Sequence, residues 1–102
     1  MSYAYVWEFH VPLALLSEFE QHYGPGGTWA QLFGSSTGYI ETLLLKDSST
    51  LGRYITVDRW RDEEAFRAFH STFSQQYEQL DRECERLTLD EQLLGVFTEC
   101  VA

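Results

Sequence analysis

The sequence predicts an α+β fold of the ferredoxin-like βαββαβ kind, with a four-stranded antiparallel sheet and its helices on one face. The first observation is the order of the predicted elements, which is strand, helix, strand, strand, helix, strand. The second is the stretch from Asp62 to Leu87, whose apolar spacing predicts one long amphipathic helix with a wide aromatic face. Such a face needs a broad apolar surface, and a sheet is the only candidate. Residues 1–102 are expected to form a single domain.

The N-terminal part of the chain is predicted to contribute one strand and two helices. Tyr3 to His10 is short and rich in aromatic residues, as strands often are. Pro12 suits the first turn of a helix, which we expect to run to Tyr23 and to end at the glycines of 24–27. Residues 28–31 read Thr-Trp-Ala-Gln, which has the form of a capping box and predicts a short second helix.

The remaining strands are predicted at residues 39–46, 53–61 and 93–100. The link over residues 47–52 is rich in turn-forming residues and short enough for an antiparallel hairpin. Acidic residues at 62–64 suit the start of the long helix, where free amides and the helix dipole favour carboxylates. Residues 88–91 read Thr-Leu-Asp-Glu, which offers a second capping box and one helical turn before the last strand.

The predicted sheet has one face that its helices cannot cover. Strands one to three carry aromatic or aliphatic side chains in both alternation classes, so both faces of the sheet are partly apolar. A second copy of the chain is the simplest cover for the bare face. We therefore expect a homodimer in which the two sheets face each other.

Composition excludes several classes of partner. Seven basic residues against sixteen acidic ones give a formal net charge of −9, which argues against binding to nucleic acid or to an anionic membrane surface. No apolar run approaches a membrane span, and the N-terminus lacks the pattern of a signal peptide. Two cysteines do not form a disulfide framework, so a cytoplasmic protein with free thiols is expected. His10, His22 and His70 have no metal-ligand spacing on one helix face, and no metal site is predicted.

Short motifs over most of the chain occur in an order that resembles one known family. They are Val6-Trp7-Glu8-Phe9, Glu18-Phe19-Glu20, Tyr23-Gly24, Trp29, Leu32-Phe33, Gly38-Tyr39, Arg53-Tyr54, Asp58-Arg59-Trp60 and Glu64-Ala65-Phe66. Together they resemble the antibiotic biosynthesis monooxygenase-like (ABM) family of dimeric α+β barrels. The resemblance implies that fold and a dimer. It leaves the function open, because the family includes quinol-type oxygenases, haem degraders and other members.

The activities that the resemblance implies can be compared with this chain residue by residue. Family members that oxygenate polyketide-derived phenols without a cofactor, and members that degrade haem, rely on an active-site asparagine. This sequence contains no asparagine. The three haem-degrading residues of the family correspond to Trp7, Phe69 and Gln79 here, and none matches. Haem degradation is therefore disfavoured, and a cofactor-free oxygenase would need a different residue set.

Aromatic residues make up 16% of the chain, which fits either an efficiently packed core or an aromatic-lined cavity. Each candidate is by itself a plausible core residue, whereas the group would suit a flat aromatic ligand between sheet and helices. The candidate walls are Trp7, Trp29, Phe33, Tyr39, Phe69, Phe73 and Tyr77. Trp60 is interpreted as structural.

His70 is the most suggestive polar residue, at the edge of the aromatic helix face. A neutral imidazole there would be able to take a proton from a phenol or hydroquinone, which makes such molecules reactive toward oxygen. The alternative is a helix-edge histidine that hydrogen-bonds to backbone, to Ser74 or to water. Asp58 and Arg59 must point to opposite sheet faces, and for the inward one an intrachain or intersubunit ion pair is favoured over catalysis.

The leading hypothesis is a homodimer that binds a small aromatic or quinone-type molecule and oxygenates or rearranges it without a metal or flavin. In this hypothesis His70 is the proton acceptor. Two alternatives stay open: a non-catalytic ligand-binding or assembly module of the same fold, and a polyketide cyclase-like enzyme that transfers protons.

Overall fold

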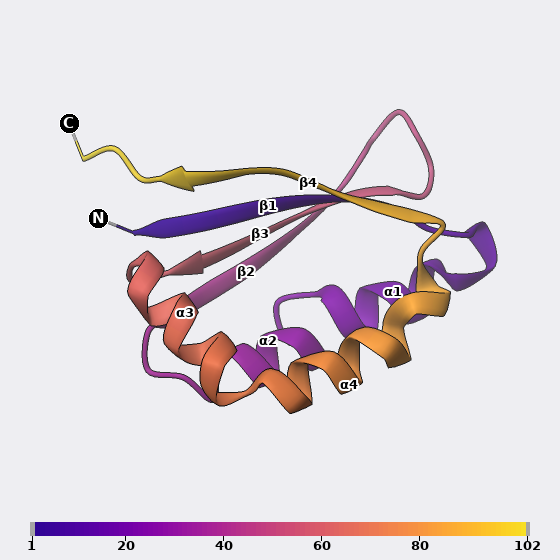
Figure 1. The fold of residues 1–102 in the computed structure, drawn as a ribbon. Coiled ribbons are helices and arrows are strands. Elements are labelled where there is room, and N and C mark those ends of the chain that lie inside the picture. The colour runs from indigo at the N-terminus through magenta and orange to yellow at the C-terminus, as the bar shows by residue number, and fades with distance from the viewer. Residues whose placement is uncertain (1, 102) are drawn as a thin grey trace.

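The computed structural model describes residues 2–101 (Figure 1). In chain order the elements are β1 (Tyr3–His10), η1 (Leu13–Leu15), α1 (Leu16–Tyr23), α2 (Thr28–Phe33), β2 (Tyr39–Lys46), β3 (Arg53–Trp60), α3 (Glu63–Thr72), α4 (Ser74–Cys84), η2 (Glu85–Leu87) and β4 (Asp90–Thr98). Of the helices in this range, none combines the length and the apolar character needed to cross a membrane.

The strands form one antiparallel four-stranded sheet in the order β2-β3-β1-β4. All the helices lie on the same side of this sheet, and the other side is bare (Figure 1). The prediction of a ferredoxin-like α+β fold is therefore confirmed. The first and third strands are the two inner strands, so their side chains lie over the middle of the core.

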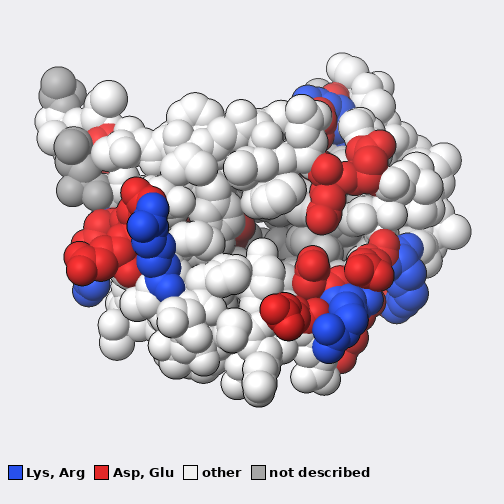
Figure 2. Space-filling view, in the orientation of Figure 1, with Lys and Arg blue, Asp and Glu red and all other residues white. Residues whose placement is uncertain are grey.

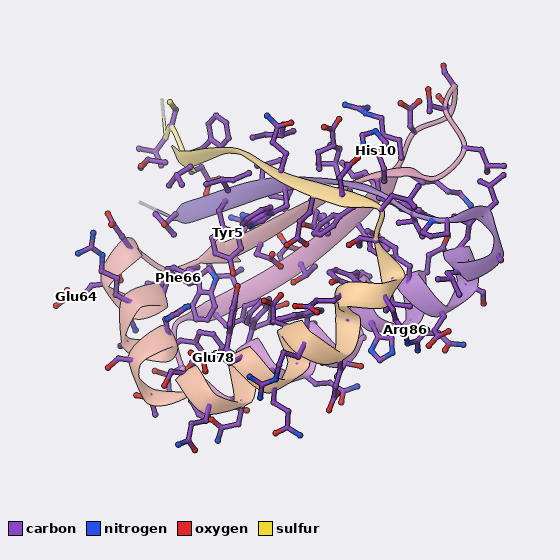
Figure 3. The ribbon with its side chains drawn as sticks, turned by 45° about the vertical axis from the view of Figure 1, so that its right-hand side comes forward. Tyr5, His10, Glu64, Phe66, Glu78 and Arg86 are labelled. Carbon is purple, nitrogen blue, oxygen red and sulfur yellow. The ribbon has the colours of Figure 1, made fainter. Side chains whose placement is uncertain are left out.

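Side-chain alternation on the inner strands decides which residues face the helices. On β3 every second residue is buried, namely Tyr54, Thr56, Asp58 and Trp60. The register pairs Tyr5 with Asp58 across the strands, so the odd-numbered residues of β1 face the same way. Figure 3 shows Tyr5 on β1 and Phe66 on α3 pointing toward each other, whereas His10 lies on the other side of the sheet.

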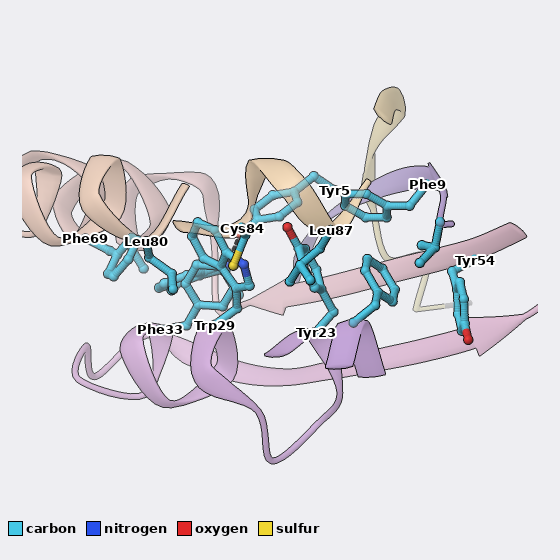
Figure 4. Close-up of a cluster of buried hydrophobic side chains, with 14 residues drawn as sticks. Tyr5, Phe9, Tyr23, Trp29, Phe33, Tyr54, Phe69, Leu80, Cys84 and Leu87 are labelled. Carbon is cyan, nitrogen blue, oxygen red and sulfur yellow. Dashed lines mark hydrogen bonds between the residues drawn. The ribbon is translucent and has the colours of Figure 1, made fainter. Parts of the chain in front are cut away.

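The core is predominantly aromatic, with rings from the sheet and the helices in contact (Figure 4). Trp60 is fully buried, and its indole N–H donates a 3.3 Å hydrogen bond to the hydroxyl of Tyr5. The rings of Phe33 and Phe69 pack against Trp60 at centroid distances of 5.7 Å and 5.2 Å. Trp60 thus joins the end of β3 to α2 and α3, as its structural interpretation requires.

The long helix predicted from Asp62 to Leu87 is interrupted at Phe73, which separates α3 from α4. Phe73 has φ −110° and ψ 25°, outside the regular helical range. The break follows Ser71 and Thr72 and precedes Ser74, residue types with lower helix propensity. The change of direction at Phe73 is visible in Figure 1 and allows α4 to run back toward α1. The start was predicted correctly, since the Asp62 carboxylate accepts a 2.8 Å hydrogen bond from the amide of Ala65.

Both predicted capping boxes are wrong. Gly27, not Thr28, precedes the first turn of α2, and the Thr28 hydroxyl instead lies 2.9 Å from Nδ1 of His22. At residues 88–91 there is no helical turn, because β4 already begins at Asp90 and pairs with His10 at the end of β1. The last strand ends at Thr98, two residues earlier than predicted. At residues 28–31 and 88–91, tertiary contacts override a local capping motif that is only four residues long.

Gly38 allows the loop before β2 to press against the start of α3. A Cβ atom at Gly38 would lie 2.3 Å from the Cβ of Ala65, and the Gly38 carbonyl accepts a 2.7 Å hydrogen bond from the amide of Arg61. We expect Gly38→Ala to lower the free energy of unfolding by about 1–3 kcal/mol through overpacking, measured by urea denaturation. Gly26→Ala is the matched control, because nothing lies within 4 Å of its Cβ position. Equal losses in the two variants would contradict this account.

Candidate active site

A cavity lies between the sheet and the helices, next to the aromatic core. Its volume is about 180 Å³, and a dry cavity of about 150 Å³ is large enough to bind benzene. Figure 2 shows a hollow between the sheet and the helices with acidic side chains at its rim. The lining residues are Tyr5, Trp7, Phe9, Tyr23, Trp29, Phe33, Thr42, Thr56, Asp58, Tyr77, Asp81 and Glu91. The cavity thus accommodates one aromatic ring among aromatic walls, with polar groups from the sheet.

Asp58 is the buried polar group on the sheet side of the cavity, with only 6% of its surface exposed. The hydroxyl of Thr42 on β2 donates a 2.6 Å hydrogen bond to one carboxylate oxygen, Oδ1. The hydroxyl of Tyr39 lies 2.6 Å from the same Thr42 oxygen. Because Thr42 has one proton and donates it to Asp58, Tyr39 acts as the donor to Thr42. The three side chains therefore form a chain of hydrogen bonds that ends at Asp58.

The second oxygen of Asp58, Oδ2, has no hydrogen-bond partner among residues 2–101. It is also not among the fully enclosed unpartnered atoms of this range, so it opens to the cavity that Asp58 lines. No cation in this range pairs with the carboxylate. Burial therefore raises the pKa of Asp58 from 3.8 to about 6, although the Thr42 hydrogen bond acts to lower it. The result is a carboxyl group that gains and loses a proton near neutral pH.

The indole N–H of Trp29 is a second unusual polar group in the lining. Burial raises the pKa of Tyr23 and of Cys84, and the nearby Trp29 indole acts to lower both. The indole nitrogen therefore lies near the Tyr23 hydroxyl and the Cys84 sulfur, yet its N–H makes no hydrogen bond of ordinary geometry within the described part of the chain. An unpartnered buried donor of this kind destabilises a folded protein by about 1–3 kcal/mol. The nitrogen itself is enclosed by protein atoms, so this N–H does not face the open part of the cavity.

The rim of the cavity is acidic. Asp81 on α4 and Glu91 on β4 both line it, together with the phenol ring of Tyr77. The pKa of Tyr77 is raised to about 12, first by burial and then by the negative charges of Asp81, Glu91 and Asp58. Burial also raises the pKa of Glu91, and the charges of Asp81 and Glu85 raise it further. Three carboxyl groups thus act on one tyrosine hydroxyl. Among residues 2–101, no three histidine, cysteine or acidic side chains form a group able to hold a metal ion.

Four of the seven predicted wall residues line the cavity: Trp7, Trp29, Phe33 and Tyr77. The other three do not. Phe69 is buried in the core, and Phe73 is half-buried and stacks on Phe69 at 5.5 Å. Tyr39 packs on Phe33 and Trp60 and reaches the site only through the Thr42 hydroxyl.

His70 is exposed on α3 and is not part of the cavity lining. Its ring lies 4.8 Å from the ring of Tyr77 and 5.9 Å from that of Phe66, measured between centroids. His70 is therefore separated from the cavity by the Tyr77 ring. Its catalytic role stays a prediction.

Sequence reasoning missed Asp58 as a site residue, together with Thr42, Thr56, Asp81 and Glu91. The sequence contained one signal for Asp58. It lies two residues before Trp60 on the predicted strand, and residues two apart on a strand point to the same face of the sheet. Asp58 does face inward, whereas Arg59 on the other face pairs with Glu41 and Glu99. The expected ion pair for the inward residue is replaced by the Thr42 hydroxyl. That contact depends on the register of β2 and β3, which slips between Tyr39 and Glu41.

Comparisons with known proteins support the fold and indicate a family. The sequence profile of the family described as antibiotic biosynthesis monooxygenase matches residues 28–79, half of the chain. Among curated proteins, none matches the sequence.

Solved structures resemble this chain over nearly its whole length. SnoaB, a cofactor-independent oxygenase from Streptomyces nogalater, superposes with a TM-score of 0.65 at 22% sequence identity, covering 99% of this chain and 95% of that one. A mutant of SnoaB gives a TM-score of 0.71 at 23% identity over the same shares. Rv0793 from Mycobacterium tuberculosis superposes with a TM-score of 0.73 at 13% sequence identity, and the match covers 100% of this chain and 98% of the Rv0793 chain. At these identities the likeness shows a common fold.

Replacement of Asp58 by asparagine should stabilise the protein at alkaline pH. The folded-state pKa of about 6 lies above the ordinary 3.8, so the free energy of unfolding falls as pH rises between these values. The asparagine side chain would keep an acceptor for Thr42 without carrying a charge. We expect Asp58→Asn to raise the free energy of unfolding by about 1–3 kcal/mol at pH ~8 and to change it little at pH ~4.

Urea denaturation at the two pH values measures this effect. The matched control is Glu83→Gln, which removes one exposed carboxylate from α4 outside the cavity. An Asp58→Asn variant that is less stable than the parent at alkaline pH would contradict the burial of an unpaired charge.

Proposed function

The chain belongs to the antibiotic biosynthesis monooxygenase family, and we propose that it is an enzyme that oxygenates a small, flat phenol or quinol in the cavity without a cofactor. The observation that carries this proposal is the free oxygen of Asp58 inside an aromatic cavity. An aromatic lining binds a flat ring by stacking and by burial of apolar area. A carboxylate with one unpartnered oxygen is placed to accept a proton from a hydroxyl on that ring.

The proposed reaction begins with transfer of the phenol proton to Asp58. Because burial raises the pKa of Asp58 to about 6, the carboxylate is a stronger base than an ordinary aspartate and is still largely ionised at neutral pH. The phenolate that forms is electron-rich and reacts with dioxygen. One oxygen atom becomes a new ring carbonyl and the other leaves as water, and the substrate supplies all the electrons.

Two further side chains support this chemistry. The hydrogen-bond chain from Tyr39 through Thr42 holds Asp58 in one orientation. In this scheme Asp58 takes the part for which other family members use asparagine.

His70 is the second candidate for the proton acceptor. Its ring packs on Tyr77, which lines the cavity, and a proton that reaches the Tyr77 hydroxyl would have the imidazole nearby. His70 is exposed, so we assign it the outer position and Asp58 the inner one.

The proposed assembly is a homodimer that covers the bare face of the sheet. Paired residues on this face include Leu43 and Val57, Val57 and Val6, and Leu45 and Ile55. Leu43, Leu45 and Phe97 are 41%, 52% and 54% exposed. Ion pairs flank the apolar strip, with Arg53 bound to Glu8 and Asp47 at one end. An apolar strip with a charged border suits contact with a second sheet.

Asp58→Asn is expected to lower kcat by about 100-fold or more, because it removes the general base. Oxygen uptake would be followed with an electrode, and products by mass spectrometry, for a panel of single-ring phenols and quinols. In the parent, kcat should rise with pH to a plateau above the Asp58 pKa of about 6.

His70→Gln distinguishes the two acceptors, and Glu83→Gln serves as the surface control. A loss of activity in His70→Gln with full activity in Asp58→Asn would assign the base to His70. Ligands that bind tightly to the parent but are never oxygenated would instead support a non-catalytic binding module.

Leu43→Asp is expected to convert the dimer to monomer, since it places a charge in the apolar strip without disturbing the core. Leu51→Asp is the control, because Leu51 is 70% exposed in the turn between β2 and β3. Sedimentation velocity measures the mass of each variant. A parent protein that sediments as a monomer would refute the proposed assembly.

A further inference from the structure

The cavity carries negative charge that no cation of its own lining balances. Asp58, Asp81 and Glu91 line it, and the lining contains neither lysine, arginine nor histidine. The arginines that form ion pairs do so outside the cavity lining. Arg53 and Arg59 lie on the bare sheet face, Arg61 and Arg67 pair with Asp62 and Glu63 at the start of α3, and Arg86 pairs with Glu18. An anionic ligand would therefore meet repulsion at the rim and no compensating group inside.

The acidic character continues outward from the cavity. An adjoining groove, which we call the outer groove, shares Tyr23, Asp81 and Glu91 with the cavity and adds Cys84, Glu85, Thr88, Leu89 and Asp90. Asp81 and Glu91 therefore stand where the cavity meets the outer groove. Of the carboxylates there, Asp90 is bound to His10 at 2.6 Å, whereas Asp81 and Glu91 have no hydrogen-bond or ion-pair partner within residues 2–101.

Asp58 provides an independent sign that a ligand completes this site. It is more than nine-tenths buried, and its Oδ2 opens to the cavity without a partner. The surrounding rings of Trp7, Trp29 and Tyr77 present π faces and edges to the same space. Carboxylates combined with aromatic rings form the usual environment for an organic ammonium group.

We propose that the molecule bound here is an aromatic phenol that carries a protonated amine. Its ring occupies the cavity beside Asp58, and its ammonium group lies between Asp81 and Glu91 at the entrance to the outer groove. The inference rests on the proposed function only in taking this cavity as the substrate site.

The charge of the reaction favours the same ligand. Proton transfer to Asp58 moves one negative charge from that carboxylate to the ligand, so an ammonium group on the ligand itself would stabilise the phenolate that forms. A metal ion is a less suitable partner for Asp81 and Glu91 than an ammonium group, because these carboxylates do not form a metal-binding group among residues 2–101.

Three single-ring phenols that differ in one substituent test the proposal: an aminomethyl, a hydroxymethyl and a carboxyl derivative. Binding to the full chain is measured by calorimetry and by quenching of tryptophan fluorescence. We expect the aminomethyl compound to bind about tenfold tighter than the hydroxymethyl compound, and the carboxyl compound to bind most weakly. The preference should shrink as salt concentration rises.

The double variant Asp81→Asn with Glu91→Gln should abolish the preference, so that the aminomethyl and hydroxymethyl compounds bind with equal affinity. Glu83→Gln, with the loss of one charge outside the cavity, should keep the preference. Equal affinities in the parent, or a preference that survives in the double variant, would overturn this inference alone. Failure of all three rings to bind would overturn the proposed function with it. Preferred binding of the amine without oxygen uptake would overturn only the catalysis.

Discussion

The two-residue alternation of β3 is the constraint on which the rest of the structure depends. Trp60 must face the helices, because its ring packs on Phe33 and Phe69 and its N–H bonds to Tyr5. A strand that turns Trp60 inward also turns Asp58 inward. The same geometry that anchors the core therefore places a carboxyl group on the floor of the cavity, where burial raises its pKa to about 6.

Element order and periodicity were sufficient to predict the sheet, its connections and the side that the helices cover. They did not separate core aromatics from cavity walls. Phe69 and Tyr77 belong to the same predicted helix face, yet Phe69 fills the core and Tyr77 lines the cavity. The difference arises at Phe73, where the helix changes direction, and the serine and threonine residues around the break are only a weak signature of it in the sequence.

The polar half of the site was harder to predict, because it depends on contacts between strands. Asp58 was expected to need a cation, whereas Thr42 from the neighbouring strand supplies a hydroxyl instead. Which residue of β2 lies opposite Asp58 follows from the register slip between Tyr39 and Glu41. His70 shows a second limit of sequence reasoning, since helical spacing places it beside aromatic residues without telling whether that edge of the helix meets the cavity or solvent.

The unsatisfied oxygen of Asp58 connects ligand binding to stability. Oδ2 offers a free acceptor to the cavity, and its burial lowers the stability of the folded chain unless a ligand supplies a donor. The packing does not require this carboxyl group, because Trp60 holds the inner strands and helices together with its own hydrogen bond satisfied. A phenol hydroxyl can donate to the carboxylate. A ligand of that kind would therefore recover stability that the fold alone does not provide, which relates the affinity of the cavity to the free-energy cost of its one unsatisfied oxygen.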